Sequence, residues 1–196
     1  MKALILVDIQ NDFLPGGSLP VAGGDLIIPL VNKIQADFDL VVATQDWHPA
    51  NHKSFASMHE GKSPYEVIML RDLQQVLWPD HCVQGSQGAE FSSALDTNRI
   101  AATFRKGMNS EIDSYSGFYD NGHLHAIGLS GYLKERGVGE VYVCGLAADF
   151  CVFFTAMDSL KEVFSTFIIS EATKAIDEVG YSEKKQEFIA AGGKFR

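Results

Sequence analysis

Five apolar runs of strand length are the feature that most constrains the fold of this chain. They cover residues 3–9, 40–44, 100–104, 140–146 and 166–170. None shows the alternation of apolar and polar residues expected of a strand with one solvent-exposed face. Continuous apolar strands are typical of parallel sheets that are covered on both faces. The runs therefore predict a sheet that is buried between two layers.

Segments with a helical spacing of apolar residues lie between these runs, at residues 26–36, 124–136, 151–163 and 182–191. In the second segment Leu124, Ile127, Leu129 and Leu133 form one apolar stripe, and Gly137 is the type of residue that ends a helix. Strands and helices thus alternate. We expect a doubly wound α/β fold, with a mainly parallel sheet flanked by helices on both faces.

The length and composition bound the class of protein. With 196 residues, 46% hydrophobic and 21% charged, the chain is long enough for one well-buried core and short for two. No repeat or linker interrupts it, so we expect a single domain over residues 1–196. The net charge of -9 argues against a nucleic acid or an anionic membrane as partner, since both attract basic surfaces. A small molecule is the expected partner, and a homo-oligomer is left open.

The cysteines and the start of the chain indicate a cytoplasmic protein. Cys82, Cys144 and Cys151 are odd in number and include no C-x-x-C pair. Asp8 interrupts the first apolar run too early for the apolar core of a secretory signal peptide. No apolar run approaches the roughly 20 residues that a spanning helix needs. We therefore expect reduced thiols, a cytoplasmic location and no membrane span.

Two long segments, residues 45–88 and 106–122, interrupt the alternation of strands and helices. The first is rich in His, Pro, Ser and Gly, and the second in Ser, Asp, Asn, Tyr and Gly. Long loops in compact domains often have a functional role. Both follow predicted strands, so they begin at the carboxyl ends of the sheet, where α/β proteins place their binding sites.

Cys151 follows the run 140–146 through small residues into a helix-compatible segment. In the first turn of a helix, a thiolate is stabilised by the helix dipole and by free backbone N–H groups, which can also bind an oxyanion. This arrangement favours a nucleophile. The commoner role of a lone cysteine is that of a small buried hydrophobe, which we expect of Cys144.

Asp8 and Lys106 are charged residues at the ends of apolar runs. A carboxylate in this place is either a turn residue or a general base whose pKa is tuned by burial and neighbours. A lysine at a strand end is commonly solvated. If Lys106 instead points inward between Asp8 and Cys151, its charge stabilises both the carboxylate and the thiolate.

Asp46 and His48 follow the second run, and His81 follows some thirty residues later. Two histidines and one carboxylate form an incomplete metal shell with room for water. This donor set suits zinc, iron or manganese and does not select among them. Surface loops also contain Asp-x-His by chance. His52 is close enough in sequence to join the shell and equally able to point into solvent.

Six motifs resemble, in order, those of the nicotinamidase branch of the isochorismatase-like cysteine hydrolases. They are DIQNDF at 8–13, QDWHP at 45–49, WPDHCV at 78–83, RKG at 105–107, DSYSGF at 113–118 and GLAADFCV at 145–152. One such match is plausible by chance, and six in order are not. The resemblance covers nearly the whole chain and implies a parallel sheet flanked by helices.

The resemblance implies roles for individual residues. The implied catalytic triad is Asp8, Lys106 and Cys151. The implied oxyanion hole is formed by the backbone N–H groups of Ala147 and Cys151, after a cis peptide bond at Leu146–Ala147. The residues implied to contact the substrate ring are Phe13, Trp78 and Tyr115. The implied metal ligands are Asp46, His48 and His81, with His52 as a further candidate.

The resemblance also implies one divalent metal ion, with zinc as the first expectation and iron or manganese as alternatives. Ala148 and Phe150 differ from the family pattern, in which many members have Thr and Tyr or His, and Phe150 is expected to change the pocket wall. The carboxyl end is short for the family, so we expect an abbreviated final edge strand.

The implied activity is hydrolysis of nicotinamide to nicotinate and ammonia through a thioester on Cys151. Pyrazinamide is an equal candidate substrate. The alternative is another hydrolase of the superfamily, acting on a different small amide, a carbamoyl compound or a vinyl ether. Many such relatives lack the set Asp46, His48 and His81, which favours the first interpretation. A non-catalytic binding protein would not need a complete triad, and a redox sensor would need a resolving cysteine closer than Cys144.

Overall fold

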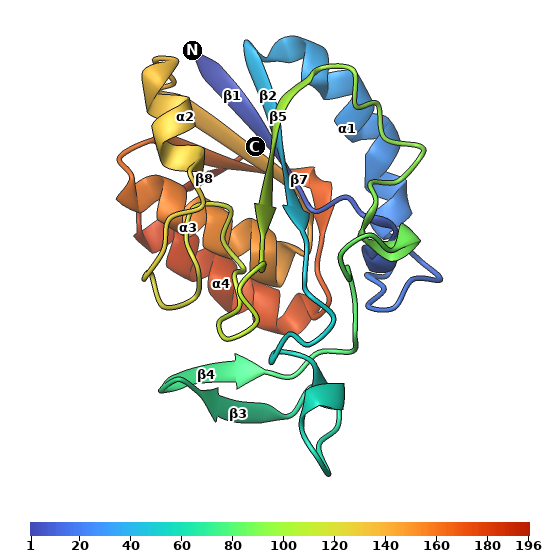
Figure 1. Ribbon diagram of the computed structural model, residues 1–196. Helices are drawn as coiled ribbons and strands as arrows, with labels where there is room; N and C mark the ends of the chain where they lie inside the picture. Colours follow the sequence, from blue (N-terminus) through green and yellow to red (C-terminus); the bar gives the residue numbers. More distant parts are fainter.

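Six parallel strands form the main sheet, in the order β5-β2-β1-β6-β7-β8 (Figure 1). A computed structural model describes all 196 residues. The strands of this sheet are β1 (Lys2–Val7), β2 (Leu40–Asp46), β5 (Ile100–Lys106), β6 (Glu140–Leu146), β7 (Ser165–Lys174) and β8 (Lys194–Phe195). The helices are α1 (Ile28–Ile34), α2 (Leu129–Glu135), α3 (Phe153–Lys161) and α4 (Glu178–Ala190). None of these helices combines the length and the apolar content that crossing a membrane requires.

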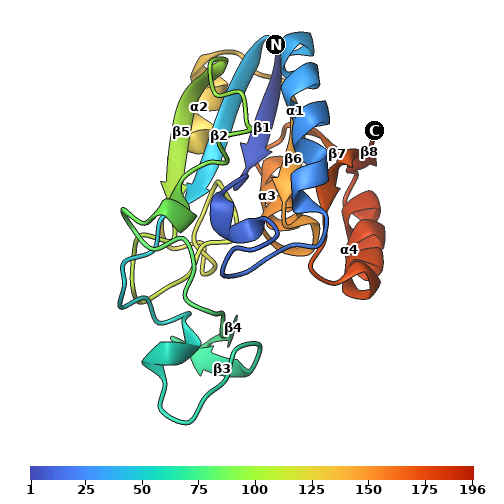
Figure 2. The same ribbon diagram turned by 90° about the vertical axis from the view of Figure 1, so that its right-hand side faces the viewer.

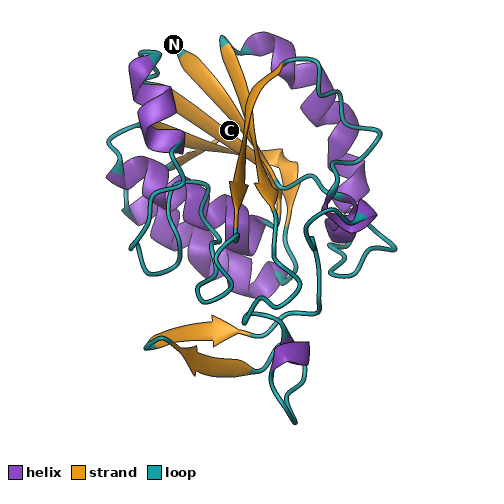
Figure 3. Ribbon diagram, viewed as in Figure 1, coloured by secondary structure: helices purple, strands orange, loops and turns teal.

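Helices cover both faces of the sheet, which confirms the predicted fold class (Figures 2 and 3). The central strand β1 packs through both faces, which explains why its sequence does not alternate between apolar and polar residues. Leu4 and Leu6 belong to one core cluster, together with residues of α1. Ala3, Ile5 and Val7 belong to a second cluster, together with residues of α2, α3 and α4. Since both faces of β1 meet a helical layer, every position favours an apolar side chain.

Strand β5 departs from the prediction of burial on both faces. Ala102 and Phe104 are half-buried against the core, whereas Ala101 and Thr103 are exposed. Phe104 packs edge-to-face on Tyr132 of α2, with ring centroids 5.3 Å apart. β5 is the edge strand with β2 as its only neighbour, and only Ile100 at its start packs on the core cluster of the opposite face. The opposite edge ends in β8, which has two residues and is as short as expected.

Two helices do not begin at the residues that the spacing of their apolar side chains predicts. The stripe that starts at Leu124 is helical only from Leu129, because Asp120 Oδ1 accepts a hydrogen bond from the Leu124 N–H at 2.8 Å. Such side-chain bonds compete with helical ones. Helix α4 instead begins earlier than predicted, because the Asp177 carboxylate accepts hydrogen bonds from two N–H groups of its first turn.

A hairpin of two antiparallel strands, β3 (Val67–Leu70) and β4 (Leu73–Val76), interrupts the long segment after β2 and was not predicted. In Figure 1 it lies apart from the sheet, beyond the carboxyl ends of the strands. Its turn residues Arg71 and Asp72 have φ of 50° and 63°. Two-residue turns of this kind usually contain Asn or Gly, and this one contains neither. The usual sequence signal for a hairpin is therefore missing.

The carboxyl ends of the strands bring several polar residues to one edge of the sheet. Asp8 directly follows β1, while Asp46 and Lys106 end β2 and β5 and face each other in register. Strand β6, on the other side of β1, ends at Leu146 just before the segment with Cys151. In doubly wound sheets, ligands bind at this edge where the strand order reverses, which here is beside β1.

Candidate active site

Asp8 is a fully buried carboxylate in the turn after β1, with a φ of 49°. Its Oδ1 accepts a hydrogen bond from Thr44 Oγ1 at 2.6 Å, and its Oδ2 lies 2.8 Å from Lys106 Nζ. Burial disfavours the charged carboxylate and the Lys106 ammonium only partly offsets this, so the pKa of Asp8 rises from 3.8 to about 6. Asp8 is thus suited to exchange a proton near neutral pH.

Lys106 points inward from the end of β5 and is only 1% exposed. Its Nζ lies 2.5 Å from Asp46 Oδ1, 3.0 Å from the Ser114 carbonyl oxygen and 3.4 Å from Cys151 Sγ. Burial lowers the pKa of an ammonium, but the Asp46 and Asp8 carboxylates outweigh burial and raise the pKa of Lys106 well above 10.5. A permanent positive charge therefore contacts Asp8 and Cys151 together, the inward arrangement that the sequence left open.

Cys151 lies in a single π-helical turn, Ala148–Val152, between the end of β6 and the start of α3. Burial raises the pKa of its thiol well above 9.0, although the Lys106 charge acts in the opposite direction. The resting form is therefore the thiol, and a base has to remove its proton before it can attack. Cys144, in contrast, is buried inside β6 in the apolar core, as expected.

Asp46, His48 and His81 direct three donor atoms toward one another. Asp46 Oδ2 lies 3.7 Å from His48 Nε2 and 3.9 Å from His81 Nε2. The other nitrogen of each ring is engaged, since His48 Nδ1 lies 3.0 Å from the Gly107 carbonyl oxygen and His81 Nδ1 lies 2.8 Å from that of Pro79. Such contacts orient the rings and leave both Nε2 atoms available to a metal ion.

His52 is fully buried beside this group and has one ring nitrogen without a partner. Its Nδ1 lies 2.7 Å from Ser54 Oγ, whereas Nε2 has no hydrogen-bond partner. Its ring centroid is 4.4 Å from that of His48, and donor atoms of His48, His52 and Asp113 lie within 4.8 Å of one another. A buried nitrogen without a partner is costly. Of the two placements left open for His52, the structure shows the inward one.

The protonation of the histidines follows from their surroundings. Burial, helped by the nearby His48, lowers the pKa of His81 to about 4, and burial also lowers the pKa of His52. For His48 the Asp46 carboxylate outweighs burial and raises the pKa. Metal binding needs neutral imidazole. His81 and His52 are therefore neutral at pH 7, as ligation requires.

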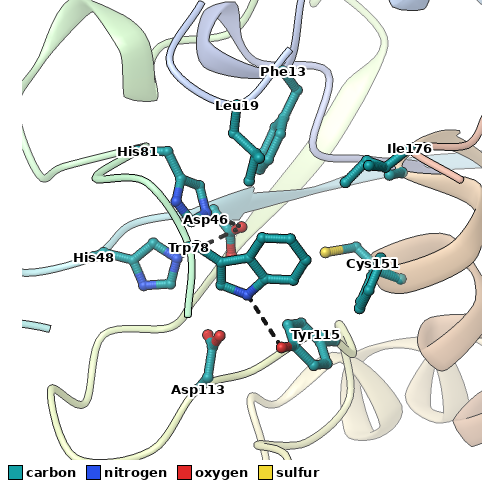
Figure 4. Close-up of a pocket in the computed structure, with 12 residues that line it drawn as sticks. Phe13, Leu19, Asp46, His48, Trp78, His81, Asp113, Tyr115, Cys151 and Ile176 are labelled. Carbon is teal, nitrogen blue, oxygen red and sulfur yellow. Dashed lines mark hydrogen bonds and ion pairs between the residues drawn. The ribbon is translucent and has the colours of Figure 1, made fainter. Parts of the chain in front are cut away.

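The side chains of Cys151, Asp46, His48 and His81 line one cavity (Figure 4). In Figure 4 His48 and His81 lie on one side of the cavity and Cys151 on the other. The aromatic lining of the cavity consists of Phe13, Trp78, Tyr115 and Phe150. Trp78 Nε1 donates a hydrogen bond to the Tyr115 hydroxyl at 3.2 Å, which ties two of these rings together. Apolar walls with a few polar groups at the ends are typical of small-molecule sites.

The structure brings together all the residues that the sequence singled out for this site. Ala147 lines the cavity with Cys151, and the bond between Leu146 and Ala147 is cis, where the resemblance implied it. Phe150 packs edge-to-face on Trp78, with ring centroids 4.9 Å apart, so it contributes to the pocket wall as expected.

Sequence reasoning missed four residues of the site. Asp113 lines the cavity and accepts a hydrogen bond from Gln75 of the hairpin at 3.2 Å. It begins the 113–118 motif, so a signal for it was present. Leu19 and Ile176 line the cavity from segments without any motif. Thr44, which donates to Asp8, has the sequence context of an ordinary strand threonine.

The chain is similar to known proteins over nearly its whole length. A family model for the isochorismatase domain matches residues 2–195. A nicotinamidase of Acinetobacter baylyi is 51% identical over 191 residues, covering 97% of this chain and 89% of the relative. The structure of a nicotinamidase/pyrazinamidase of Acinetobacter baumanii is 48% identical, with a TM-score of 0.97 over 99% of this chain and 94% of that one.

A further structure, the pyrazinamidase of Pyrococcus horikoshii in complex with zinc, is 38% identical, with a TM-score of 0.83 over 100% of this chain and 98% of that one. Sequence and structural similarity thus agree with the six motifs over the whole fold. The chain belongs to the isochorismatase family, in its nicotinamidase branch.

Proposed function

We propose that this chain is an amide hydrolase that converts nicotinamide to nicotinate and ammonia, with pyrazinamide as a second substrate. One observation supports this most directly. A single cavity has a thiol with an adjacent base at one side, a metal-binding donor set at the other, and aromatic rings between them. The similar proteins named nicotinamidase or pyrazinamidase support the same substrate class.

We place the substrate ring between the aromatic walls. Phe13 and Trp78 contact the faces of the pyridine, and Tyr115 closes the wall beside them. Aromatic rings bind each other through such contacts and orient the ring for reaction. We place the carboxamide at Cys151 and the ring nitrogen on the opposite side of the cavity, where Figure 4 shows His48 and His81.

The first half of the reaction forms a thioester. Asp8 takes the proton of the Cys151 thiol, whose Sγ and the Asp8 carboxylate lie within 4.8 Å of each other. The Lys106 ammonium stabilises the resulting thiolate. The thiolate attacks the carboxamide carbon, and the N–H groups of Ala147 and Cys151 bind the oxyanion. Protonated Asp8 then gives its proton to the leaving nitrogen, and ammonia departs.

The second half regenerates the enzyme. Asp8, again unprotonated, accepts a proton from the water that attacks the thioester carbon. The same two N–H groups bind the second oxyanion. Nicotinate leaves, and the Cys151 sulfur recovers its proton from Asp8.

Asp46, His48 and His81 are the residues that would hold a divalent metal ion, with His52 as a further ligand. The fit of the first three rests on the convergence of their donor atoms, and that of His52 on its place beside His48 and on its buried, unpartnered Nε2. We propose zinc, as in the similar pyrazinamidase that contains it, with iron or manganese as alternatives. When bound, the ion supplies a Lewis-acidic contact for the pyridine nitrogen, which fixes the position of the ring.

The experiment that tests this function measures ammonia release from nicotinamide and pyrazinamide, before and after chelation and after return of each metal. Benzamide, which lacks the ring nitrogen, is the comparison substrate. We expect metal-dependent release that is much slower with benzamide. No release from either substrate with metal present would contradict the proposal and favour another substrate of the superfamily.

A Cys151→Ala variant tests the nucleophile. It should lose all turnover, because it lacks the nucleophile. It should keep the metal content of the parent protein, because Cys151 is not one of the proposed metal ligands. Turnover equal to that of the parent would exclude Cys151 as the nucleophile.

A further inference from the structure

Asp149 is a buried carboxylate that the proposed reaction does not use. It lies in the π-helical turn, two residues before Cys151, and is 2% exposed. Its Oδ1 accepts a hydrogen bond from the Ile176 N–H at 2.9 Å, and its Oδ2 accepts one from the Asp177 N–H at 2.9 Å. Both bonds go to the segment that leads into α4. A charged group thus joins the nucleophile turn to a segment distant in sequence.

Helix α4 is tied to the same residue a second time. Lys184 Nζ donates a hydrogen bond to the backbone carbonyl oxygen of Asp149. The Lys184 ammonium also lies 4.4 Å from the centre of the Phe150 ring, which forms part of the aromatic wall. The segment before α4 therefore binds the Asp149 side chain, and α4 itself binds the Asp149 backbone.

The segment that Asp149 binds contributes a wall of the cavity. Ile176 lines the cavity together with Cys151 and lies on the Cys151 side, away from His48 (Figure 4). The carboxamide has to lie at Cys151 for attack, so the leaving nitrogen lies on this side as well. Ile176 is thus a lining residue on the side of the cavity where the leaving nitrogen has to lie.

We propose that Asp149 is a positioning residue that holds the Ile176 wall against the nucleophile turn and thereby restricts the site to primary carboxamides. This inference rests on the proposed amide hydrolysis. Asp149 itself does not reach the reacting atoms. It accepts one backbone N–H at each carboxylate oxygen, an arrangement that Asn cannot reproduce because one of its two terminal atoms is an NH₂ donor.

The test compares nicotinamide with the N-methyl amide of nicotinic acid, in the parent protein and in Asp149→Asn. We expect kcat/KM for nicotinamide to fall at least tenfold, mainly through KM. The preference for nicotinamide over the N-methyl amide should fall at least fivefold, since the wall no longer closes around the leaving nitrogen. A loss of folded protein alone would lower both rates equally, and an unchanged preference would overturn the proposal.

Asp177→Ala is the matched control. It removes a carboxylate from the same segment and destabilises the start of α4, but keeps the backbone N–H groups that Asp149 binds. Its preference between the two amides should stay within twofold of the parent, and a change equal to that of Asp149→Asn would contradict the proposal.

Hydrogen exchange at Ile176 and Asp177 separates this inference from the proposed function, because it needs no substrate. The backbone N–H groups of both residues should be protected in the parent and should exchange at least tenfold faster in Asp149→Asn. Inactivity of the parent on both amides would count against the proposed function, whereas equal exchange rates in parent and variant would count against the role of Asp149.

Discussion

Asp8 determines the acid side of the pH profile. Its pKa of about 6 means that it is increasingly protonated below pH 6, and a protonated carboxyl cannot accept the Cys151 proton. At saturating metal, kcat/KM for nicotinamide should therefore fall as the pH decreases through about 6, by roughly tenfold per pH unit below it. Initial rates between pH 4.5 and 8 measure this. A midpoint near 4, the ordinary value of an aspartate, would show that burial does not tune this group.

Lys106 supports stability as well as catalysis. It is the cation shared by the Asp8 and Asp46 carboxylates, and all three side chains are buried. Lys106→Met leaves two buried carboxylates without their cation, which should lower the free energy of unfolding by about 3 to 5 kcal/mol. Denaturant unfolding of the chelated protein measures the change.

The control for Lys106→Met is Lys53→Met, which breaks the ion pair between Lys53 and Glu111. These two side chains are 46% and 35% exposed. Solvent screens that pair, so the unfolding curve should hardly move. Equal losses in the two variants would mean that the buried cation has no special role in stability.

The individual site residues were predictable from sequence to different degrees. Asp8, Lys106 and Cys151 stand at strand ends within motifs, and the inward placement of Lys106 was one of two stated alternatives. The protonation state of Cys151 was not predictable, because burial raises its pKa more than the Lys106 charge lowers it, and burial is a property of the whole fold. Ile176 and Leu19 reach the cavity only through tertiary packing, for which the local sequence has no signal.

At the scale of elements, the turn after β5 connects the sheet to the metal-binding group. Gly107 has a φ of 66°, its carbonyl oxygen lies 3.0 Å from His48 Nδ1, and a Cβ at this position would overlap the His48 ring. Gly107→Ala should therefore displace His48 and weaken zinc binding by about 10- to 100-fold, the usual effect of losing a ligand's supporting contact. Competition with a chelator of known affinity measures this.

Gly137→Ala is the matched control for this turn. Gly137 has a φ of 68°, and a Cβ there meets nothing within 4 Å. The substitution introduces comparable backbone strain far from the histidines, so it should leave the zinc affinity unchanged. Similar zinc affinities in the two alanine variants would contradict a supporting role of Gly107.

The elements of the sheet were predictable because each strand of the buried centre meets apolar layers on both sides. The exceptions have physical causes. Strand β5 begins with an apolar run like the central strands but lies at an edge, and nothing in that run distinguishes an edge from a centre. The hairpin β3–β4 has a turn of Arg71 and Asp72 without the usual residues. The start of α2 depends on Asp120, whose side chain competes with the helix for one N–H.

At the scale of the whole molecule, the metal-binding group joins segments that are far apart in the chain. Asp46 ends β2, His48 follows it, and His81 follows the hairpin β3–β4, so the ligands enclose most of the long segment between β2 and β5. A metal ion that binds these residues only in the folded state should stabilise the fold by mass action. The sequence indicated the donors but not this link, since their convergence depends on how the intervening segment folds.

Removal of the metal should therefore lower the thermal stability of the whole protein. At zinc concentrations of about 100 times Kd, binding adds about 2.7 kcal/mol, which corresponds to roughly 5 to 11 °C in Tm for a protein of this size. Calorimetry of chelated and zinc-loaded protein measures the difference. The increment should disappear in His81→Ala and persist in Cys151→Ala, because only the first variant loses a donor. If chelation and zinc return leave Tm unchanged in the parent, the convergent side chains do not bind the ion, and positioning of the substrate ring has to come from the aromatic walls alone.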